Sequence, residues 1–102
     1  MRYTHSFPLT QQVIKAGDAS DRKSCPVAWA LWLHGYDNPA VDEYSTRLYG
    51  DYRQDVFLHT YAARTWIRDF DNECTVPAGT LVVAVDTDRP AEGSLDFVRH
   101  DA

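Results

Sequence analysis

The stretch that decides the fold is Cys25-Pro26-Val27-Ala28-Trp29-Ala30-Leu31-Trp32-Leu33. Proline suits the first position of a helix, where its missing N–H breaks no hydrogen bond, so Pro26 predicts a helix start. Gly35 predicts the helix end, just after His34. The helix has no polar face, and so short a helix is not stable in water by itself. We therefore expect it to be buried inside its own domain or against a partner.

Two elements are predicted before this helix. Arg2–Phe7 alternates aromatic or imidazole side chains with polar ones, which is the period-two pattern of a strand, and Pro8 predicts its end. Thr10 then predicts the N-cap of a short helix over Gln11–Ala16, and Gly17 predicts its end. The polar stretch that follows, up to the Cys-Pro pair, is typical of a loop.

A β-hairpin is predicted after the apolar helix and a turn at residues 36–39. Residues 42–49 and 52–59 have strand character, and Gly50-Asp51 between them suits a two-residue type II′ turn. In that register Tyr49 faces Tyr52 across the two strands.

The second half of the chain predicts one helix and one interior strand. Thr60 suits the N-cap of a helix over residues 61–71, where apolar residues recur at helical spacing, and Asn72 suits its end. Residues 80–85 are apolar on both faces, which is typical of a central strand. From Asp86 onward the chain is predicted to be a flexible tail or a segment docked as an edge strand.

Together these elements predict one α+β domain. The chain has 102 residues, which suits one domain and not two. We expect a small antiparallel sheet of three to four strands packed against two or three short helices. The domain is expected to span residues 1–86, with residues 87–102 as the flexible or edge-docked C-terminal tail.

Composition limits the classes of partner. The formal net charge is −5, from 10 Lys+Arg and 15 Asp+Glu, which disfavours a non-specific nucleic-acid binder and is compatible with binding a basic protein surface. No apolar run approaches the ~18 residues of a membrane span, and residues 1–8 lack a signal core. We therefore expect no membrane association, no direct nucleic-acid contact and a cytoplasmic location.

Cys25 is the first candidate for chemistry. A thiol at a helix N-terminus can have a lowered pKa, but a nucleophilic cysteine also needs a base, and none of the four histidines has a recognisable partner spacing. Zinc sites use short ligand pairs such as CxxC, whereas the cysteines and histidines here are scattered singly. We therefore expect no catalytic residue, no cofactor and no metal. A thiol- or metal-dependent enzyme centred on Cys25 stays an alternative.

Aromatic residues are the second candidate feature, with three Trp, six Tyr and four Phe. Trp29 and Trp32 are either completely buried, which we favour, or exposed as a protein-binding or homodimer contact. The loop and hairpin between residues 36 and 52 are acidic and rich in tyrosine, and provide the predicted protein-binding surface. Its residues are Tyr36, Asp37, Asp42, Glu43, Tyr44, Tyr49, Asp51 and Tyr52.

Two motifs carry a resemblance to a known group of proteins. Cys25-Pro26-Val27-Ala28-Trp29-Ala30-Leu31, followed about forty residues later by Trp66-Ile67-Arg68-Asp69-Phe70-Asp71, resembles a pattern in small uncharacterised proteins of bacteriophages and prophages. Those proteins similarly have a Cys-Pro-[Ile/Val]-Ala helix and a Trp-[Ile/Leu]-x-x-Phe-Asp helix. The resemblance covers roughly residues 3–85. It implies a phage-type accessory protein and carries no activity with it.

From the resemblance, the acidic charge and the aromatic excess we expect a non-enzymatic accessory protein that binds another protein in the bacterial host cytoplasm. A bacterial defence complex such as a CRISPR effector, whose nucleic-acid channel is basic, is the expected target, as for an anti-CRISPR protein. A self-associating structural phage component is the other alternative, with Trp29 and Trp32 at a homodimer seam.

Overall fold

The computed structural model describes residues 2–18, 24–36, 38–49, 54–86 and 89–100. These residues form six strands and three helices in the order β1-α1-α2-β2-β3-β4-α3-β5-β6. The strands are β1 (Arg2–Leu9), β2 (Pro39–Val41), β3 (Ser45–Tyr49), β4 (Gln54–His59), β5 (Gly79–Asp86) and β6 (Arg89–Arg99). The helices are α1 (Gln11–Ala16), α2 (Pro26–Leu33) and α3 (Tyr61–Asp71).

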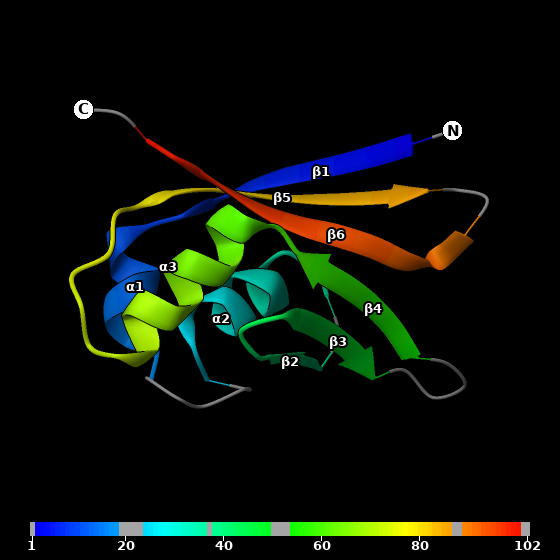
Figure 1. Cartoon of the computed structure of the whole chain (residues 1–102). Coiled ribbons are helices and arrows are strands. Elements are labelled where there is room, and N and C mark those ends of the chain that lie inside the picture. The colour runs from blue at the N-terminus through cyan, green and yellow to red at the C-terminus, as the bar shows by residue number, and fades with distance from the viewer. Residues whose placement is uncertain (1, 19–23, 37, 50–53, 87–88, 101–102) are drawn as a thin grey trace.

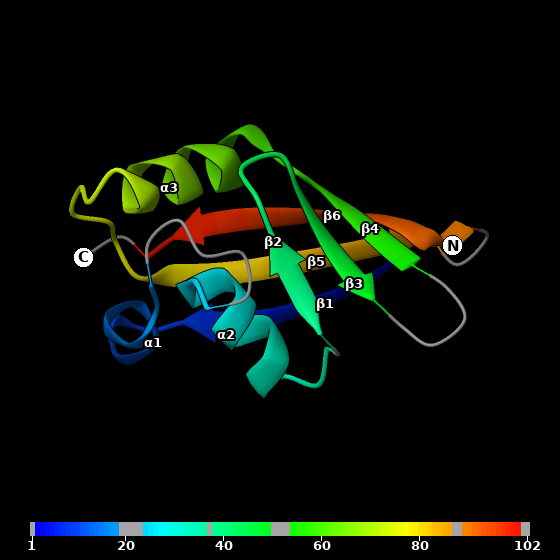
Figure 2. The same cartoon turned by 90° about the horizontal axis from the view of Figure 1, so that it is seen from below.

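All six strands belong to one curled sheet, in the order β1-β5-β6-β4-β3-β2. Four of its five pairings are antiparallel, and β4 runs parallel to β6. The sheet curls so strongly that β2 and β3 pass beneath α2 while β1 and β5 lie above it (Figures 1 and 2). Helix α2 contacts both ends of the sheet, β1 and β2. It therefore fills the hollow that the curled sheet leaves open.

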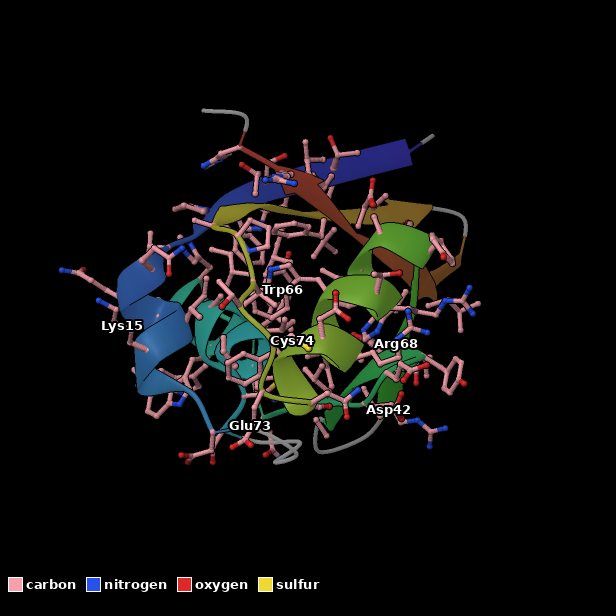
Figure 3. The ribbon with its side chains drawn as sticks, turned by 60° about the vertical axis from the view of Figure 1, so that its left-hand side comes forward. Lys15, Asp42, Trp66, Arg68, Glu73 and Cys74 are labelled. Carbon is pink, nitrogen blue, oxygen red and sulfur yellow. The ribbon has the colours of Figure 1, made fainter. Side chains whose placement is uncertain are left out.

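The core lies between the concave face of the sheet and the helices. It is built from inward-facing strand residues such as Phe57, Leu81 and Leu95 together with the buried sides of α2 and α3. Trp66 lies between α3 and the sheet (Figure 3). Its indole N–H donates to the Pro77 carbonyl at 2.8 Å, so the polar atom of this buried ring is satisfied.

The predicted helices are confirmed, and capping fixes two of them. The hydroxyl of Thr10 accepts from the Val13 N–H, and that of Thr60 accepts from the Ala63 N–H, each at 3.3 Å. The Thr60 hydroxyl also donates to Asp96 at 2.6 Å, which ties the start of α3 to β6. Helix α2 begins at Pro26 as predicted.

The α+β fold class is confirmed, but the predicted sheet of three to four antiparallel strands is wrong. The sheet has six strands and is mixed. One missed strand, β2, has only three residues and lies where turn residues predicted a loop. So short a strand has no detectable period, because alternation needs about four residues or more to register.

The predicted C-terminal tail is wrong for residues 89–99. These residues form β6, which lies inside the sheet between β5 and β4 rather than at an edge. Leu95 and Phe97 are buried toward the core, while Asp96 and Val98 lie on the other face. Two apolar inward positions are a weak period-two signal, and proline and glycine in the first half of the strand hide it further.

Two strand details also differ from the prediction. Strand β1 continues through Pro8 to Leu9, because β1 is an edge strand and an edge tolerates a residue without an N–H. Tyr49 pairs with Gln54 and not with Tyr52, so the predicted two-residue turn is wrong. The predicted turn residues Gly50 and Asp51 lie outside the described residues, as does Tyr52.

Candidate functional site

Helix α2 has one buried side and one exposed side, although nearly every residue in it is apolar. Pro26, Val27, Ala28, Ala30 and Leu31 are buried. The exposed fractions of the other three side chains are 39% for Trp29, 58% for Trp32 and 57% for Leu33. The prediction that both tryptophans are completely buried is therefore wrong. We call Trp29, Trp32 and Leu33 the tryptophan face.

The three residues of the tryptophan face are held together by helix geometry. Their spacing of three and four places them on one side of α2. The Trp29 and Trp32 rings meet edge to face, with centroids 5.8 Å apart. Both rings, together with Ala28, Asn38 and Pro39, line a hollow of about 230 Å³ between α2 and the start of β2.

The end of α2 holds this face rigidly. Gly35 has a φ of +92°, in the left-handed region that favours glycine, and it reverses the chain after the helix. The Tyr36 N–H then returns to the Leu31 carbonyl at 3.0 Å. This bond satisfies a carbonyl of the last helical turn. The tryptophan face is therefore carried on a well-terminated helix seated in the core.

Such a face suits contact with another protein. Tryptophan is enriched among residues that dominate binding energy, since a large rigid ring becomes buried on contact at low cost in conformational entropy. Neighbouring exposed aromatic and aliphatic side chains form the apolar centre of a typical interface. None of its three side chains is titratable. The face can therefore stabilise a complex by burying apolar surface, but it supplies no acid, base or nucleophile.

The structure separates the members of the predicted acidic and tyrosine-bearing surface. Tyr36 is half-buried and its hydroxyl lies 2.9 Å from Nδ1 of His5. Burial, and secondarily the nearby Tyr3, raises the pKa of Tyr36. Asp42 and Glu43 are half-buried in the turn between β2 and β3. Tyr44 is exposed, and Tyr49 ends β3. Asp37, Asp51 and Tyr52 lie outside the described residues.

Tyr44 belongs to a small exposed aromatic group with α3 and not with Tyr36. The guanidinium of Arg64 lies 5.7 Å from the ring centre of Tyr44 and 5.8 Å from that of Tyr61. Both distances fit cation–π contacts. Tyr36 by contrast packs against Phe7 and Phe57 at the core. Of the predicted set, Tyr36 and Tyr44 therefore contact different parts of the molecule.

His59 is a buried histidine that organises the turn before β3. Its Nδ1 lies 3.0 Å from the Glu43 carbonyl oxygen, which can only accept, so Nδ1 carries the hydrogen. Its Nε2 then accepts from the hydroxyl of Thr46 at 2.7 Å. The turn itself is closed by the Asp42 carboxylate, which accepts from the Tyr44 and Ser45 N–H groups at 2.8 Å. In neutral His59 both ring nitrogens are therefore satisfied.

A pH dependence of stability follows from His59. Burial lowers its pKa below the ordinary 6.5, and this outweighs the upward effect of the Glu43 hydrogen bond. The unfolded chain then binds the proton more readily, so stability is complete above about pH 6.5 and falls as the pH drops below it. Thermal melts from pH 7.5 downward are expected to show this loss.

The matched variant for this prediction is His59→Asn, whose amide can still donate to Glu43 but does not titrate. It is expected to be less stable at neutral pH and to flatten the melting-temperature profile between about pH 6.5 and pH 5. An unchanged slope in the variant would assign the pH dependence to other groups.

The geometry gives little support to a thiol- or metal-dependent enzyme centred on Cys25. Cys25 is a buried N-cap residue, and the exposed Cys74 donates its thiol to the Asn72 carbonyl at 3.9 Å. No group of three or more His, Cys, Asp or Glu that could hold a metal is found among the described residues. In the same part of the chain, no helix has the length and apolar character needed to cross a membrane.

A second hollow of about 370 Å³ lies between α3, the segment that precedes β5 and the end of β6. Its lining residues are Tyr61, Ala62, Thr65, Trp66, Asp69, Val76, Pro77, Phe97 and Arg99. Two of its three large rings, Trp66 and Phe97, are buried against each other with centroids 5.7 Å apart, and the third, Tyr61, is exposed. Trp66 and Phe97 therefore belong to the core, whereas both rings of the tryptophan face are exposed to a partner.

No family model matches this chain, and comparison with curated proteins and with solved structures finds no match either.

Proposed function

We propose that this chain is a non-enzymatic accessory protein of the phage type that acts by binding another protein through the tryptophan face. The observation that carries the proposal is the exposure of Trp29 and Trp32 side by side on a rigid helix. Exposing two large rings raises the free energy of the isolated protein relative to burying them. A partner that covers them recovers that free energy on binding.

The charge of the chain supports a basic partner. With a net charge of −5, the protein is attracted to positively charged surfaces and repelled by nucleic acid. Proteins that handle nucleic acid carry such basic surfaces in their binding channels. We propose as target a bacterial defence complex of this type in the host cytoplasm, such as a CRISPR effector, with inhibition following from occupation of its basic channel.

The test compares the removal of exposed rings from two different helices. The double variant Trp29→Ala/Trp32→Ala is expected to weaken binding of the captured partner at least ten-fold, because truncation of a hot-spot residue typically costs ~2 kcal/mol or more. Tyr61→Ala, which removes a still more exposed ring from α3, is expected to leave affinity unchanged. The partner is captured from bacterial lysate with tagged protein, identified, and measured by calorimetry with each variant.

Two further measurements test whether the partner has a basic surface and whether it is a CRISPR effector. Binding to a basic surface is expected to weaken as salt rises from about 50 mM to about 500 mM, because screening shortens electrostatic range. Phage plaque counts on a host with an active CRISPR system are expected to rise when the chain is expressed, and not with the double tryptophan variant. Equal affinity of the double variant and the wild type would contradict the proposed surface.

The thiol-enzyme alternative has a separate and simple test. Titration of the native protein with a thiol reagent is expected to modify the exposed Cys74 readily and the buried Cys25 slowly. Rapid modification of Cys25 together with bound metal would favour the enzyme over the binding protein.

A further inference from the structure

Strand β1 forms one end of the sheet and leaves a long edge open. It pairs with β5 without interruption over eight residues, from Arg2 opposite Asp86 to Leu9 opposite Gly79. The described residues place no strand on its other side. The opposite end of the sheet is different, because β2 has three residues and all three are buried. The edge strand β1 therefore exposes more unpaired backbone N–H and C=O groups than the edge strand β2 does.

Pro8 shows which backbone groups point outward from β1. Within a strand, the N–H and C=O of one residue point to one side and those of the next residue point to the other. Proline in a sheet places its missing N–H on the unpaired side. By this alternation Thr4 and Ser6 direct their N–H and C=O groups away from β5. The open edge thus presents alternating donors and acceptors.

This edge lacks the usual protection against strand pairing. Exposed edges are commonly blocked by charged side chains, by bulges or by a covering element. Residues 3–7 include no Lys, Arg, Asp or Glu, and the pairing with β5 has no bulge there. Pro8, near the end of the strand, is the one residue of β1 that has no backbone N–H to donate. Tyr3, on the concave face, leaves 59% of its surface exposed beside this edge.

We propose that two copies of this chain associate through β1, pairing antiparallel with Thr4 opposite Ser6 of the second copy. An antiparallel edge is self-complementary, because a two-fold axis places the same donors opposite the same acceptors. This register pairs residues 2–8 of both strands. The two central Thr4–Ser6 pairs make both of their hydrogen bonds, and each outer Arg2–Pro8 pair lacks the bond that an N–H of Pro8 would donate. It also brings the exposed Tyr3 beside the concave face of the second copy, where cross-strand ring contacts are favourable.

A second copy fits this edge better than an unrelated strand. The absence of charge along residues 3–7 removes the repulsion that would otherwise oppose pairing of identical chains. The two-fold axis stands perpendicular to the sheet, so the helices of both copies lie on the same face of one continuous sheet. Figure 2 shows β1 and α2 on the side of the molecule opposite α3. The dimer therefore presents two tryptophan faces on one side.

The proposal rests on β1 and is independent of the proposed function, which rests on α2. Sedimentation velocity of the wild type between about 1 µM and about 100 µM is expected to show a monomer–dimer equilibrium. Thr4→Pro removes an outward N–H without breaking a bond to β5 and is expected to weaken the dimer at least ten-fold. Thr4→Val keeps that N–H and is expected to dimerise like the wild type.

A second pair of variants covers the case in which Thr4→Pro does not fold. Ser6→Lys places like charges on neighbouring strands near the axis and is expected to weaken the dimer at least ten-fold. Val98→Lys adds the same charge on the same face of the sheet, but on the interior strand β6, and is expected to leave dimerisation unchanged. Circular dichroism confirms folding of each variant.

Amide hydrogen exchange identifies the seam directly. At high concentration the N–H groups of Thr4 and Ser6 are expected to become protected at least ten-fold relative to dilute protein, while those of Tyr3 and His5, which face β5, are protected at both concentrations. A wild type that stays monomeric at about 100 µM overturns the proposal. So does a dimer whose Thr4 and Ser6 amides exchange freely, or one that Thr4→Pro and Ser6→Lys leave intact.

Discussion

Trp66→Ala is expected to lower the free energy of unfolding by about 4 kcal/mol, within the ~3–5 kcal/mol typical of such truncations. The ring is buried between α3 and the sheet, stacked on Phe70 and tilted against Phe97 with centroids 5.7 Å away in both cases. Truncation removes these contacts, leaves a cavity and also strips the Pro77 carbonyl of its indole donor.

Two control variants separate these contributions. Trp66→Phe keeps most of the ring volume and loses the indole N–H, so it is expected to cost about 1–2 kcal/mol. Tyr61→Ala on the exposed side of the same helix is expected to cost less than about 0.5 kcal/mol. Urea unfolding followed by far-UV circular dichroism measures all three. A loss below about 1 kcal/mol for Trp66→Ala would mean that α3 does not pack on the sheet as described.

Leu31→Ala is expected to lower the free energy of unfolding by about 3 kcal/mol, whereas Trp32→Ala, one residue further along, is expected to change it by less than about 1 kcal/mol. Leu31 is fully buried in the hollow of the curled sheet, and Trp32 belongs to the tryptophan face. Truncating the larger Trp32 is therefore predicted to lower the free energy of unfolding less than truncating Leu31, because the loss depends on how far the side chain is buried and not on its size.

The same two variants test function and fold together. Trp32→Ala should weaken partner binding while it leaves the urea midpoint almost unchanged. Leu31→Ala should lower the urea midpoint, while its folded fraction should bind the partner as the wild type does. Equal destabilisation by both variants would mean that α2 buries its whole circumference. In that case the tryptophan face would not exist as a surface.

Local signals predicted the helices well because those signals are decided by neighbouring residues. Thr10 and Thr60 cap helices through bonds to N–H groups three residues away, and Pro26 starts α2 through its own ring. The strand β1 and the interior strand β5 were also readable from side-chain alternation or continuous apolarity. Each of these signals depends only on a few consecutive residues.

The missed elements depend on contacts that are distant along the chain. Strand β6 has a weak pattern of its own and is fixed by pairing with β5 on one side and β4 on the other. The hairpin register differs from the prediction because Tyr49 pairs with Gln54, whereas the expected turn pairs Tyr49 with Tyr52. Neither feature can be obtained from a short window of sequence.

The candidate site was predicted only as the less favoured of two interpretations. Apolar residues lie all round this helix, so the sequence alone could not say which side of α2 faces outward. Size offered a hint: the buried side carries the smaller residues Val27, Ala28 and Ala30 besides Leu31, and the large rings share the other side. His59 and its partners Thr46 and Glu43 were not foreseen as a network, because they converge only through β3–β4 pairing.

The position of β6 has a consequence for the order in which the fold can form. Within the described part of the chain, β6 alone joins two pieces of sheet, β1–β5 and β4–β3–β2. One partner of β6 is β5, which directly precedes it along the chain, and the other is the more distant β4. The strand β1 must likewise wait for β5, which lies far along the chain. Folding of such a topology is slowed by the loop entropy of these distant pairings. Until β6 is in place the chain can form only two open half-sheets, and the hollow for α2 is not yet closed.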